Sequence, residues 1–303
     1  MKNVGIIGLG VVSKYLVFGL TNSKKWRLVS IADIDTNKKE KTEQLNCKFY
    51  NNYLEMLAKE SLDYVVISTP PESHYKIIKD ALNAGKNVLV EKPVVLDTLQ
   101  YQEIFNIAKQ KKLVLRGIYH WQNSLEIKHF IKNYNPKKIT SIKLDIKDPY
   151  SQDGKTVLPD RVALKGAWID SGVNVLSMLK LLLPFDSYKI ENTQFIFCKK
   201  SGIPIFAKVN LKIDQVNVEI TVDWRTMINN KVTTIKYDGY DIVLDHTNQK
   251  VISKGKTKEL YKMARMNTHY YNYFTYFKGV TDTPNYSKIY EILLKVRECY
   301  EKA

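Results

Sequence analysis

The sequence predicts an α/β protein with two domains, of which the first has a doubly wound parallel sheet and the second a large open, mainly antiparallel sheet in an α+β arrangement. Over residues 1–120, short apolar runs alternate with amphipathic segments, a pattern typical of repeated β-α-β units. From about residue 136 the runs lengthen and alternate in polarity, as in antiparallel strands with one buried face. We therefore expect domains at 1–120 and 121–303.

Strands of the first domain are expected where β-branched and aliphatic residues cluster. These runs are NVGIIG, RLVSIAD, DYVVIS, NVLVEK and LVLRGIY. The segments between them show helical periodicity, as in SHYKIIKDALNAG and TLQYQEIFNIAKQKK, so each parallel strand is expected to connect to the next through a helix.

Strands of the second domain are expected in longer alternating runs. These include KKITSIKLDIKD, SYKIENTQFIFCKK, IPIFAKVNLKI, QVNVEITVDW, KVTTIKYDG and KVISKG. Two helices are expected beside this sheet, one from Gly172 to Leu183 and one near Lys288 to Lys302. We find no internal repeat, low-complexity segment or long linker.

The composition is that of an ordinary globular protein, with 44% hydrophobic and 26% charged residues. The net charge of +16 suggests attraction to polyanions, but the lysines are scattered as pairs and nucleic-acid-binding motifs are missing, which argues against that function. No apolar run is long enough to span a bilayer, and the N-terminus does not fit a signal peptide. Three widely spaced cysteines indicate neither disulfides nor a metal site. We expect a cytoplasmic protein.

A glycine turn follows the first expected strand and opens the first helix. It consists of Gly8, Leu9, Gly10, Val11, Val12 and Ser13. Such glycines let the backbone approach a pyrophosphate, whose charge the helix N-terminus then stabilises, as in a Rossmann domain. Asp33 ends the next strand twenty residues after Ser13, where a carboxylate would bind both ribose hydroxyls of NAD and repel the 2′-phosphate of NADP. The alternative is that Asp33 only caps a turn.

Further polar residues follow two later strands at the same carboxyl edge. Thr69 and Pro70 follow DYVVIS, and Glu91 and Lys92 end NVLVEK. Ligands of parallel sheets bind beyond the carboxyl ends of the strands, so these residues are predicted to bind the cofactor, with Lys92 at its nicotinamide end. His74 lies in the first turn of the next helix and is either a helix-cap partner or a site residue.

A polar pair lies at the start of the helix expected in the second domain. Asp170 and Asn174 are four residues apart, so both side chains lie on one helix face if the helix includes them. Together with a lysine they could bind two hydroxyls of a polyol. The alternative is that Asp170 is simply the N-cap of this helix.

These residues resemble the glucose-fructose oxidoreductase and inositol dehydrogenase family. The resemblance covers nearly the whole chain and includes the glycine turn and STPPESHYKIIKDALNAGKNVLVEKPV. Within the family, the chain looks most like aldose 1-dehydrogenases acting on galactose or arabinose. The residues that suggest this are Tyr119-His120, the run from Asp170 to Ser177, and Asp223-Trp224-Arg225.

The resemblance implies roles for particular residues. Lys92 corresponds to the catalytic lysine, Asp170 to the acid near it, and Asn174 to a position where inositol dehydrogenases have a histidine. His120, Asp148 and Tyr270 correspond to substrate-binding residues. The second domain is then a substrate-binding and oligomerisation domain, and the protein a homodimer or homotetramer.

The chain departs from the expected patterns at four places. They are Ser13 in place of the third glycine, Trp121 in place of a polar residue, a poor match over 152–165, and Lys165-Gly166 in place of a glycine pair. In relatives the segment before Asp170 lines the sugar pocket, so the sugar is left undefined.

The expected reaction is NAD(P)-dependent oxidation at C1 of an aldose to an aldonolactone, without a metal. Because Asn174 cannot exchange protons, Lys92 and Asp170 would provide the acid-base chemistry. Burial and a positively charged nicotinamide would favour a neutral Lys92, whereas Asp170 would favour its ammonium form. Alternatives are a dehydrogenase of a nucleotide sugar or an inositol-like polyol, and a non-catalytic regulator that binds NAD and a sugar.

Overall fold

The chain divides into two compact units in the computed structural model, which describes residues 1–282 and 286–301. One unit comprises Met1–His120 and His269–Ser287, and the other Trp121–Thr268 and Lys288–Ala303. The sequence predicts that residues 121–303 form the second domain, whereas the chain returns to the first unit at His269.

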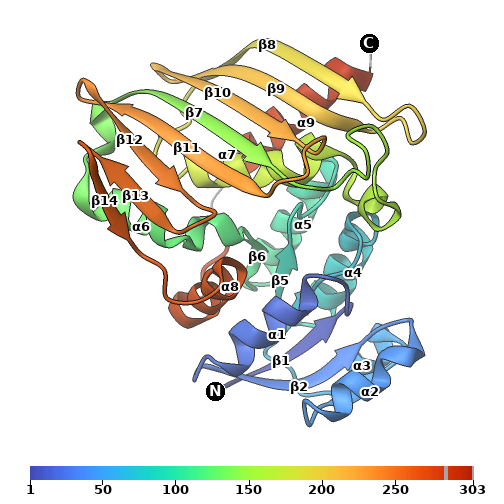
Figure 1. Cartoon of the computed structure of the whole chain (residues 1–303). Coiled ribbons are helices and arrows are strands. Elements are labelled where there is room, and N and C mark those ends of the chain that lie inside the picture. The colour runs from blue at the N-terminus through green and yellow to red at the C-terminus, as the bar shows by residue number, and fades with distance from the viewer. Residues whose placement is uncertain (283–285, 302–303) are drawn as a thin grey trace. The chain divides into compact units, whose positions relative to one another are not determined.

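The first unit contains a parallel six-stranded sheet in the order β3-β2-β1-β4-β5-β6. This is the strand order of a doubly wound dinucleotide-binding domain, so the fold predicted for this part is confirmed (Figure 1). The strands are β1 (Lys2–Ile7), β2 (Trp26–Ala32), β3 (Lys48–Tyr50), β4 (Tyr64–Ile67), β5 (Asn87–Glu91) and β6 (Leu115–Ile118). The helices between them are α1 (Ser13–Thr21), α2 (Lys39–Glu43), α3 (Tyr53–Lys59), α4 (Pro71–Asn83) and α5 (Thr98–Gln110).

Helix α8 (Arg265–Tyr276) contributes most of its residues to the first unit. The indole N–H of Trp26 donates a hydrogen bond to the carbonyl of Phe274 at 2.9 Å, and the two rings meet edge to face. A Cβ added at Gly19 would lie 2.7 Å from the Phe274 ring, so α1 and α8 approach closely only because position 19 is glycine. These long-range contacts explain why the larger part of α8 belongs to the first unit.

The second unit contains an eight-stranded sheet in the order β14-β13-β12-β11-β7-β10-β9-β8. All neighbouring strands are antiparallel except the parallel pair β7 and β10, which confirms the mainly antiparallel sheet. Its strands are β7 (Ile139–Lys147), β8 (Tyr188–Phe197), β9 (Pro204–Ile213), β10 (Val216–Asp223), β11 (Asn230–Tyr237), β12 (Tyr240–Asp245), β13 (Lys250–Ser253) and β14 (Lys256–Glu259). The helices are α6 (Leu125–Asn133), α7 (Val173–Leu179) and α9 (Tyr286–Glu301).

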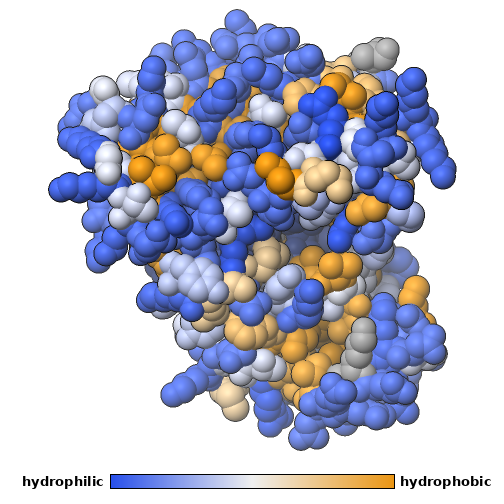
Figure 2. Space-filling view, viewed as in Figure 1, coloured by the Kyte–Doolittle hydropathy of each residue, from blue (hydrophilic) through white to orange (hydrophobic). Residues whose placement is uncertain are grey.

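The two faces of this sheet differ, as the alternating sequence pattern predicted. Residues such as Ile142, Leu144 and Ile220 are buried, and Figure 1 shows α7 and α9 beside the sheet. The other face is solvated, and Glu219 there forms ion pairs with Lys143 and Lys208 across neighbouring strands, at 3.0 and 2.8 Å. Figure 2 shows hydrophilic side chains over most of the visible surface of this unit, with apolar groups between them.

The helix expected near Lys288–Lys302 forms as α9, although Lys302 itself lies outside the described residues. Helix α7 is shorter than the expected Gly172–Leu183. None of the described helices combines the length and apolar character needed to cross a membrane.

The buried carboxyl group of Asp282 should make the stability of the first unit depend on pH. Burial raises the pKa of Asp282 to about 7, although Arg116 and the N–H of Gly117 favour its ionised form. The pKa of an Asp in an unfolded chain is about 4. Between pH 4 and 7 the folded protein therefore keeps a proton that the unfolded chain has lost. The free energy of unfolding should therefore fall with rising pH, by at most about 1.4 kcal/mol per unit from this group.

Replacing Asp282 by Asn should remove this pH dependence of the unfolding free energy, because an amide does not titrate. The hydrogen bond that Gly117 N–H donates at 2.8 Å is kept, since the amide oxygen still accepts it. Urea unfolding from pH 4 to 8 measures the effect. The control is Asp238→Asn, since the Asp238 side chain is 54% exposed. If wild type and Asp282→Asn show the same pH dependence, the assignment is wrong.

Candidate active site

The glycine turn connects β1 directly to α1. Its two glycines, Gly8 and Gly10, differ in why glycine suits the position. Gly8 has a φ of 94°, and a Cβ there would lie 2.6 Å from the carbonyl oxygen of Ser68 at the end of β4. Gly10 has an ordinary φ, and its nearest neighbour would be the same oxygen at 3.6 Å. The fold itself therefore requires glycine only at position 8, whereas glycine at position 10 leaves the backbone open to a ligand.

The N-terminus of α1 has no side-chain cap, because Val12 occupies the N-cap position. The N–H groups of a first helical turn are natural donors to a phosphate. Ser13 replaces the third glycine, and its hydroxyl donates to the carbonyl of Gly10 at 2.6 Å. Val11 and Ile34 are 58% and 92% exposed, so apolar surface is present in the turn and after β2.

Asp33 ends β2, and its carboxylate is already engaged. Its Oδ2 accepts the Leu9 N–H at 2.6 Å and the Lys38 ammonium at 3.0 Å, while Oδ1 accepts the Asp35 N–H at 2.9 Å. Burial opposes ionisation, but these donors together lower the pKa of Asp33. Asp33 therefore fixes the glycine turn through Leu9 as well as the local turn through Asp35, so turn capping is not its only structural contact.

Thr69 and Pro70 follow β4, and His74 lies in the first turn of α4. The side chain of His74 has no exposed surface. Its Nδ1 lies 2.9 Å from the Pro93 carbonyl oxygen and its Nε2 lies 2.8 Å from that of Thr69. Burial lowers the pKa of His74, although the carbonyls favour the protonated form. As a site residue, this histidine is predicted to bind the cofactor. In the structure its two ring nitrogens link the loops after β4 and β5.

Glu91 and Lys92 stand at the end of β5, as predicted. Glu91 is buried, and its carboxylate accepts the hydroxyl of Tyr270 at 2.8 Å and the backbone N–H of Lys92 at 3.3 Å. Lys92 is partly exposed. Glu91 thus anchors the backbone of the lysine to Tyr270 on α8, 179 residues away.

His120 lies two residues beyond β6, and a second histidine accompanies it. The Nδ1 atoms of His120 and His269 are 3.0 Å apart, and the His120 ring stacks on Tyr270 at 5.5 Å. One of the two Nδ1 atoms must donate and the other accept, so the pair shares a single hydrogen. His120 and Tyr270 were predicted site residues, but His269 was missed because only the fold brings α8 to this strand end.

Asp170 does not cap the helix that follows it. Residues Trp168–Gly172 form a single π-turn, and α7 begins at Val173. The capping alternative considered for Asp170 is therefore wrong, since the N-cap residue is Ala167 for the π-turn and Gly172 for α7. Turns of this kind occur frequently at functional sites. Asn174 Nδ2 donates to the backbone carbonyl of Asp170 at 3.4 Å.

The backbone before the π-turn is unusual at the position where relatives have a glycine pair. Lys165 and Gly166 both adopt a positive φ, 63° and 96°. A Cβ at Gly166 would lie 2.7 Å from Pro204, so glycine is required there. Lys165 adopts the same backbone region at the usual steric disadvantage of a residue with a Cβ.

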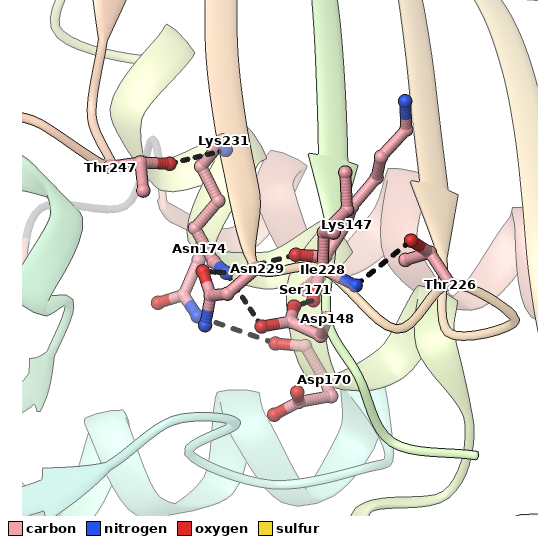
Figure 3. Close-up of polar contacts among 10 residues, drawn as sticks. All are labelled: Lys147, Asp148, Asp170, Ser171, Asn174, Thr226, Ile228, Asn229, Lys231 and Thr247. Carbon is pink, nitrogen blue, oxygen red and sulfur yellow. Dashed lines mark hydrogen bonds and ion pairs between the residues drawn. The ribbon is translucent and has the colours of Figure 1, made fainter. Parts of the chain in front are cut away.

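Asp148 follows β7 and forms a buried ion pair with Lys231 of β11. The ammonium group lies 2.6 Å from Asp148 Oδ1, and Asn229 Oδ1 accepts from it at 2.7 Å (Figure 3). Burial lowers the pKa of Lys231, while Asp148 acts in the opposite direction. Asp148 was a predicted substrate residue. Lys231 and Asn229 were missed because nothing distinguishes them locally in a chain with 47 Lys and Arg.

The predicted residues thus fall into two groups, one in each unit. The first unit brings together the glycine turn, Asp33, Thr69, Glu91, Lys92, His120 and Tyr270. The second brings together Asp148, Asp170 and Asn174. No group of three or more potential metal-binding side chains occurs among residues 1–282 and 286–301.

The strand order, the uncapped α1 and the glycine turn define a dinucleotide-binding α/β domain. Comparison with known families agrees, because residues 2–119 match the model of an oxidoreductase family with an NAD-binding Rossmann fold. The matched part is the one that carries the glycine turn and the other motifs that resemble the glucose-fructose oxidoreductase and inositol dehydrogenase family.

Curated relatives include dehydrogenases of several substrates. An inositol 2-dehydrogenase/D-chiro-inositol 3-dehydrogenase of Lactiplantibacillus plantarum is 29% identical over 148 residues, which is 48% of this chain and 39% of the relative. A UDP-N-acetylglucosamine 3-dehydrogenase of Acidithiobacillus ferrooxidans is 29% identical over 116 residues, 37% of this chain and 34% of the relative. The matched region spans less than half the length of these relatives.

Solved structures show the same fold over nearly the whole chain. The myo-inositol 2-dehydrogenase of Lactobacillus plantarum superposes with a TM-score of 0.81 at 17% identity, covering 99% of this chain and 97% of that one. GenD2 from gentamicin A biosynthesis, solved with NAD, gives 0.82 at 15% identity, covering 99% and 94%. The second unit therefore follows the architecture of these proteins as well.

The different surroundings of the two glycines predict different effects of substitution. Gly10→Ala should fold with nearly wild-type stability and lose NAD(P) affinity by at least about tenfold, because the added methyl occupies space the backbone leaves for the pyrophosphate. Gly8→Ala should instead lower the melting temperature, because its Cβ clashes with backbone. Calorimetric titration with NAD and NADP, beside thermal unfolding, separates the two. Unchanged affinity in Gly10→Ala would place the cofactor elsewhere.

Proposed function

We propose that the protein is an NAD(P)-dependent dehydrogenase that oxidises a CH–OH group of a sugar or polyol. The observation that supports this most is the position of Lys92. It directly follows β5, at the carboxyl edge where the glycine turn and Asp33 lie, and Glu91 fixes its backbone. In a doubly wound sheet this edge is where a dinucleotide binds, so a lysine there is poised beside the reacting end of the cofactor.

Oxidation of a CH–OH group requires a hydride acceptor, which the bound nicotinamide supplies, and a base for the hydroxyl proton. Lys92 accepts this proton in the reaction we propose. Asp170 and Asn174 bind hydroxyls of the substrate and hold it in a reactive orientation, which by itself lowers the barrier substantially. Asn174 cannot transfer protons, so it contributes through hydrogen bonds alone.

The substrate we favour is an aldose related to galactose or arabinose, oxidised at C1 to an aldonolactone. The support is the resemblance of Asp170–Ser177 and of Asp223-Trp224-Arg225 to aldose 1-dehydrogenases. In the structure Arg225 forms a bidentate pair with Asp223, with contacts of 2.9 and 2.8 Å. A nucleotide sugar is the second candidate, because a UDP-N-acetylglucosamine 3-dehydrogenase matches both in sequence and in fold.

Replacing Lys92 by Met should lower kcat by about 10²–10⁴-fold, since general-base catalysis contributes on that order, and leave NAD(P) affinity within about threefold. Formation of reduced nicotinamide is followed at 340 nm with NAD or NADP and a panel of free aldoses, inositols and UDP-sugars. The matched control is Lys109→Met, because Lys109 is exposed on α5 and has no proposed role.

Two results would contradict this proposal. Full turnover by Lys92→Met would show that another group accepts the proton. Tight NAD(P) binding by the wild type with no turnover on any sugar of the panel would favour the regulator that binds a cofactor and a sugar without chemistry.

NAD is the cofactor we propose. Lys38 weakens the preference for NAD over NADP. Asp33 repels a 2′-phosphate, but the Lys38 ammonium lies 3.0 Å from its carboxylate and its side chain is 27% exposed. A partly exposed ammonium at this place can turn toward a 2′-phosphate. The exclusion of NADP by Asp33 is therefore incomplete.

Lys38→Met should increase the preference for NAD over NADP by about fivefold, because it removes one ion pair of roughly 1 kcal/mol with the 2′-phosphate. The ratio of kcat/KM values for the two cofactors measures it. Lys39→Met on the neighbouring residue is the control. An unchanged ratio would show that Lys38 serves only to neutralise Asp33.

A further inference from the structure

A lysine is buried within the sheet of the second unit. The Lys231 side chain lies on β11 and is 5% exposed. Its ammonium group has three oxygen neighbours, namely Asp148 Oδ1 at 2.6 Å, Asn229 Oδ1 at 2.7 Å and the Lys147 carbonyl at 3.3 Å. Three acceptors match the three hydrogens of an ammonium group. Lys231 is thus held as a donor in a fixed position.

Stability alone is a weak reason for such a pair. Taking both charges out of water is unfavourable, and apolar residues of similar volume often stabilise a protein as well or better. A fixed lysine does, however, determine where the carboxylate of Asp148 points. Because Lys231 contacts Oδ1, this orientation determines which groups the other oxygen, Oδ2, can meet.

Two oxygens near the π-turn have incomplete hydrogen bonding. Among the described residues, Asp148 Oδ2 receives only a long contact of 3.5 Å from the Ser171 hydroxyl. Asn174 is 5% exposed, and its Oδ1 forms no hydrogen bond within the part of the chain that the structure describes. Figure 3 shows both side chains in one cluster, with Lys231 above Asp148 and Asp170 below it. Buried acceptors of this kind are expected to find donors.

Hydroxyl groups are the donors that fit these oxygens. A carboxylate and an amide oxygen both accept hydrogen bonds, and neither provides a positive charge for an anionic group. The ammonium of Lys231 already neutralises Asp148 and is occupied by protein oxygens. A ligand with two neighbouring hydroxyls, such as a sugar or a cyclic polyol, would satisfy both acceptors.

We propose that Lys231 is a positioning residue, which holds Asp148 so that Asp148 and Asn174 accept hydrogen bonds from two hydroxyls of the substrate. This inference rests on the proposed dehydrogenase function and adds a residue to it. Lys231 does not touch the substrate. Its effect is on substrate affinity through Asp148, and the hydride and proton transfers proceed as described above.

The test compares a single and a double variant. Lys231→Met leaves the Asp148 carboxylate buried without its partner, and its melting temperature should fall markedly. Lys231→Met combined with Asp148→Asn removes both charges and should recover most of that loss. Lys143→Met is the control, because Lys143 pairs with Glu219 on the same sheet but is 65% exposed. It should leave melting temperature and kinetics unchanged.

The double variant shows whether the pair of Lys231 and Asp148 serves substrate binding or only the stability of the fold. We expect its KM for the sugar to rise at least tenfold, with kcat changed less than threefold and NAD affinity unchanged. Calorimetric titration of myo-inositol, D-galactose and UDP-N-acetylglucosamine into the NADH-bound protein gives the same comparison without turnover. A double variant with wild-type melting temperature, KM and sugar affinity would overturn the proposal and leave the dehydrogenase function standing.

The remaining outcome concerns the wild type. If it binds NADH but neither binds nor oxidises any of the three probes, the proposed function fails, and the role of Lys231 fails with it. The two failures are distinguishable. Failure of the Lys231 proposal alone appears only in the double variant, whereas failure of the proposed function already appears in the wild type.

Discussion

The close approach of β1 and β4 at Gly8 is the constraint on which the cofactor site depends. The backbone turns at φ 94° with Ser68 so near that no Cβ fits. Because the turn is tight, α1 starts immediately and leaves its first N–H groups at the carboxyl edge of the sheet. The same turn places Leu9 within hydrogen-bond distance of Asp33. One missing side chain thus fixes the positions of three features that bind a dinucleotide.

A second constraint acts in the other unit, where charge is buried in a sheet. Lys231 and Asp148 lie on β11 and just after β7, which are antiparallel neighbours. Their pair needs the right register as well as the right residues, because a slip of one residue would turn Lys231 to the solvated face. The polar cluster beside the π-turn is therefore a consequence of strand register, and its precision comes from the sheet.

These two constraints explain what the sequence could and could not predict. The strands, the glycine turn and the residues after β2, β4 and β5 follow from local patterns, since parallel strands all end at one edge. The partners of those residues depend on long-range packing. His269 reaches His120 across 149 residues and Lys231 reaches Asp148 across 83. A π-turn is not encoded by periodicity either, and so Asp170 could be mistaken for a cap.

The two groups of residues differ in the chemistry they permit. In the first unit, Lys92, His120 and His269 have side chains of types that can exchange protons, and the two histidines share one hydrogen between their Nδ1 atoms. In the second unit, Asn174 offers an amide that does not exchange protons, and Asp148 is paired with the ammonium group of Lys231. In the dehydrogenase that we propose, an amide at position 174 is compatible with catalysis, because the proposed proton acceptor, Lys92, belongs to the cofactor-binding unit.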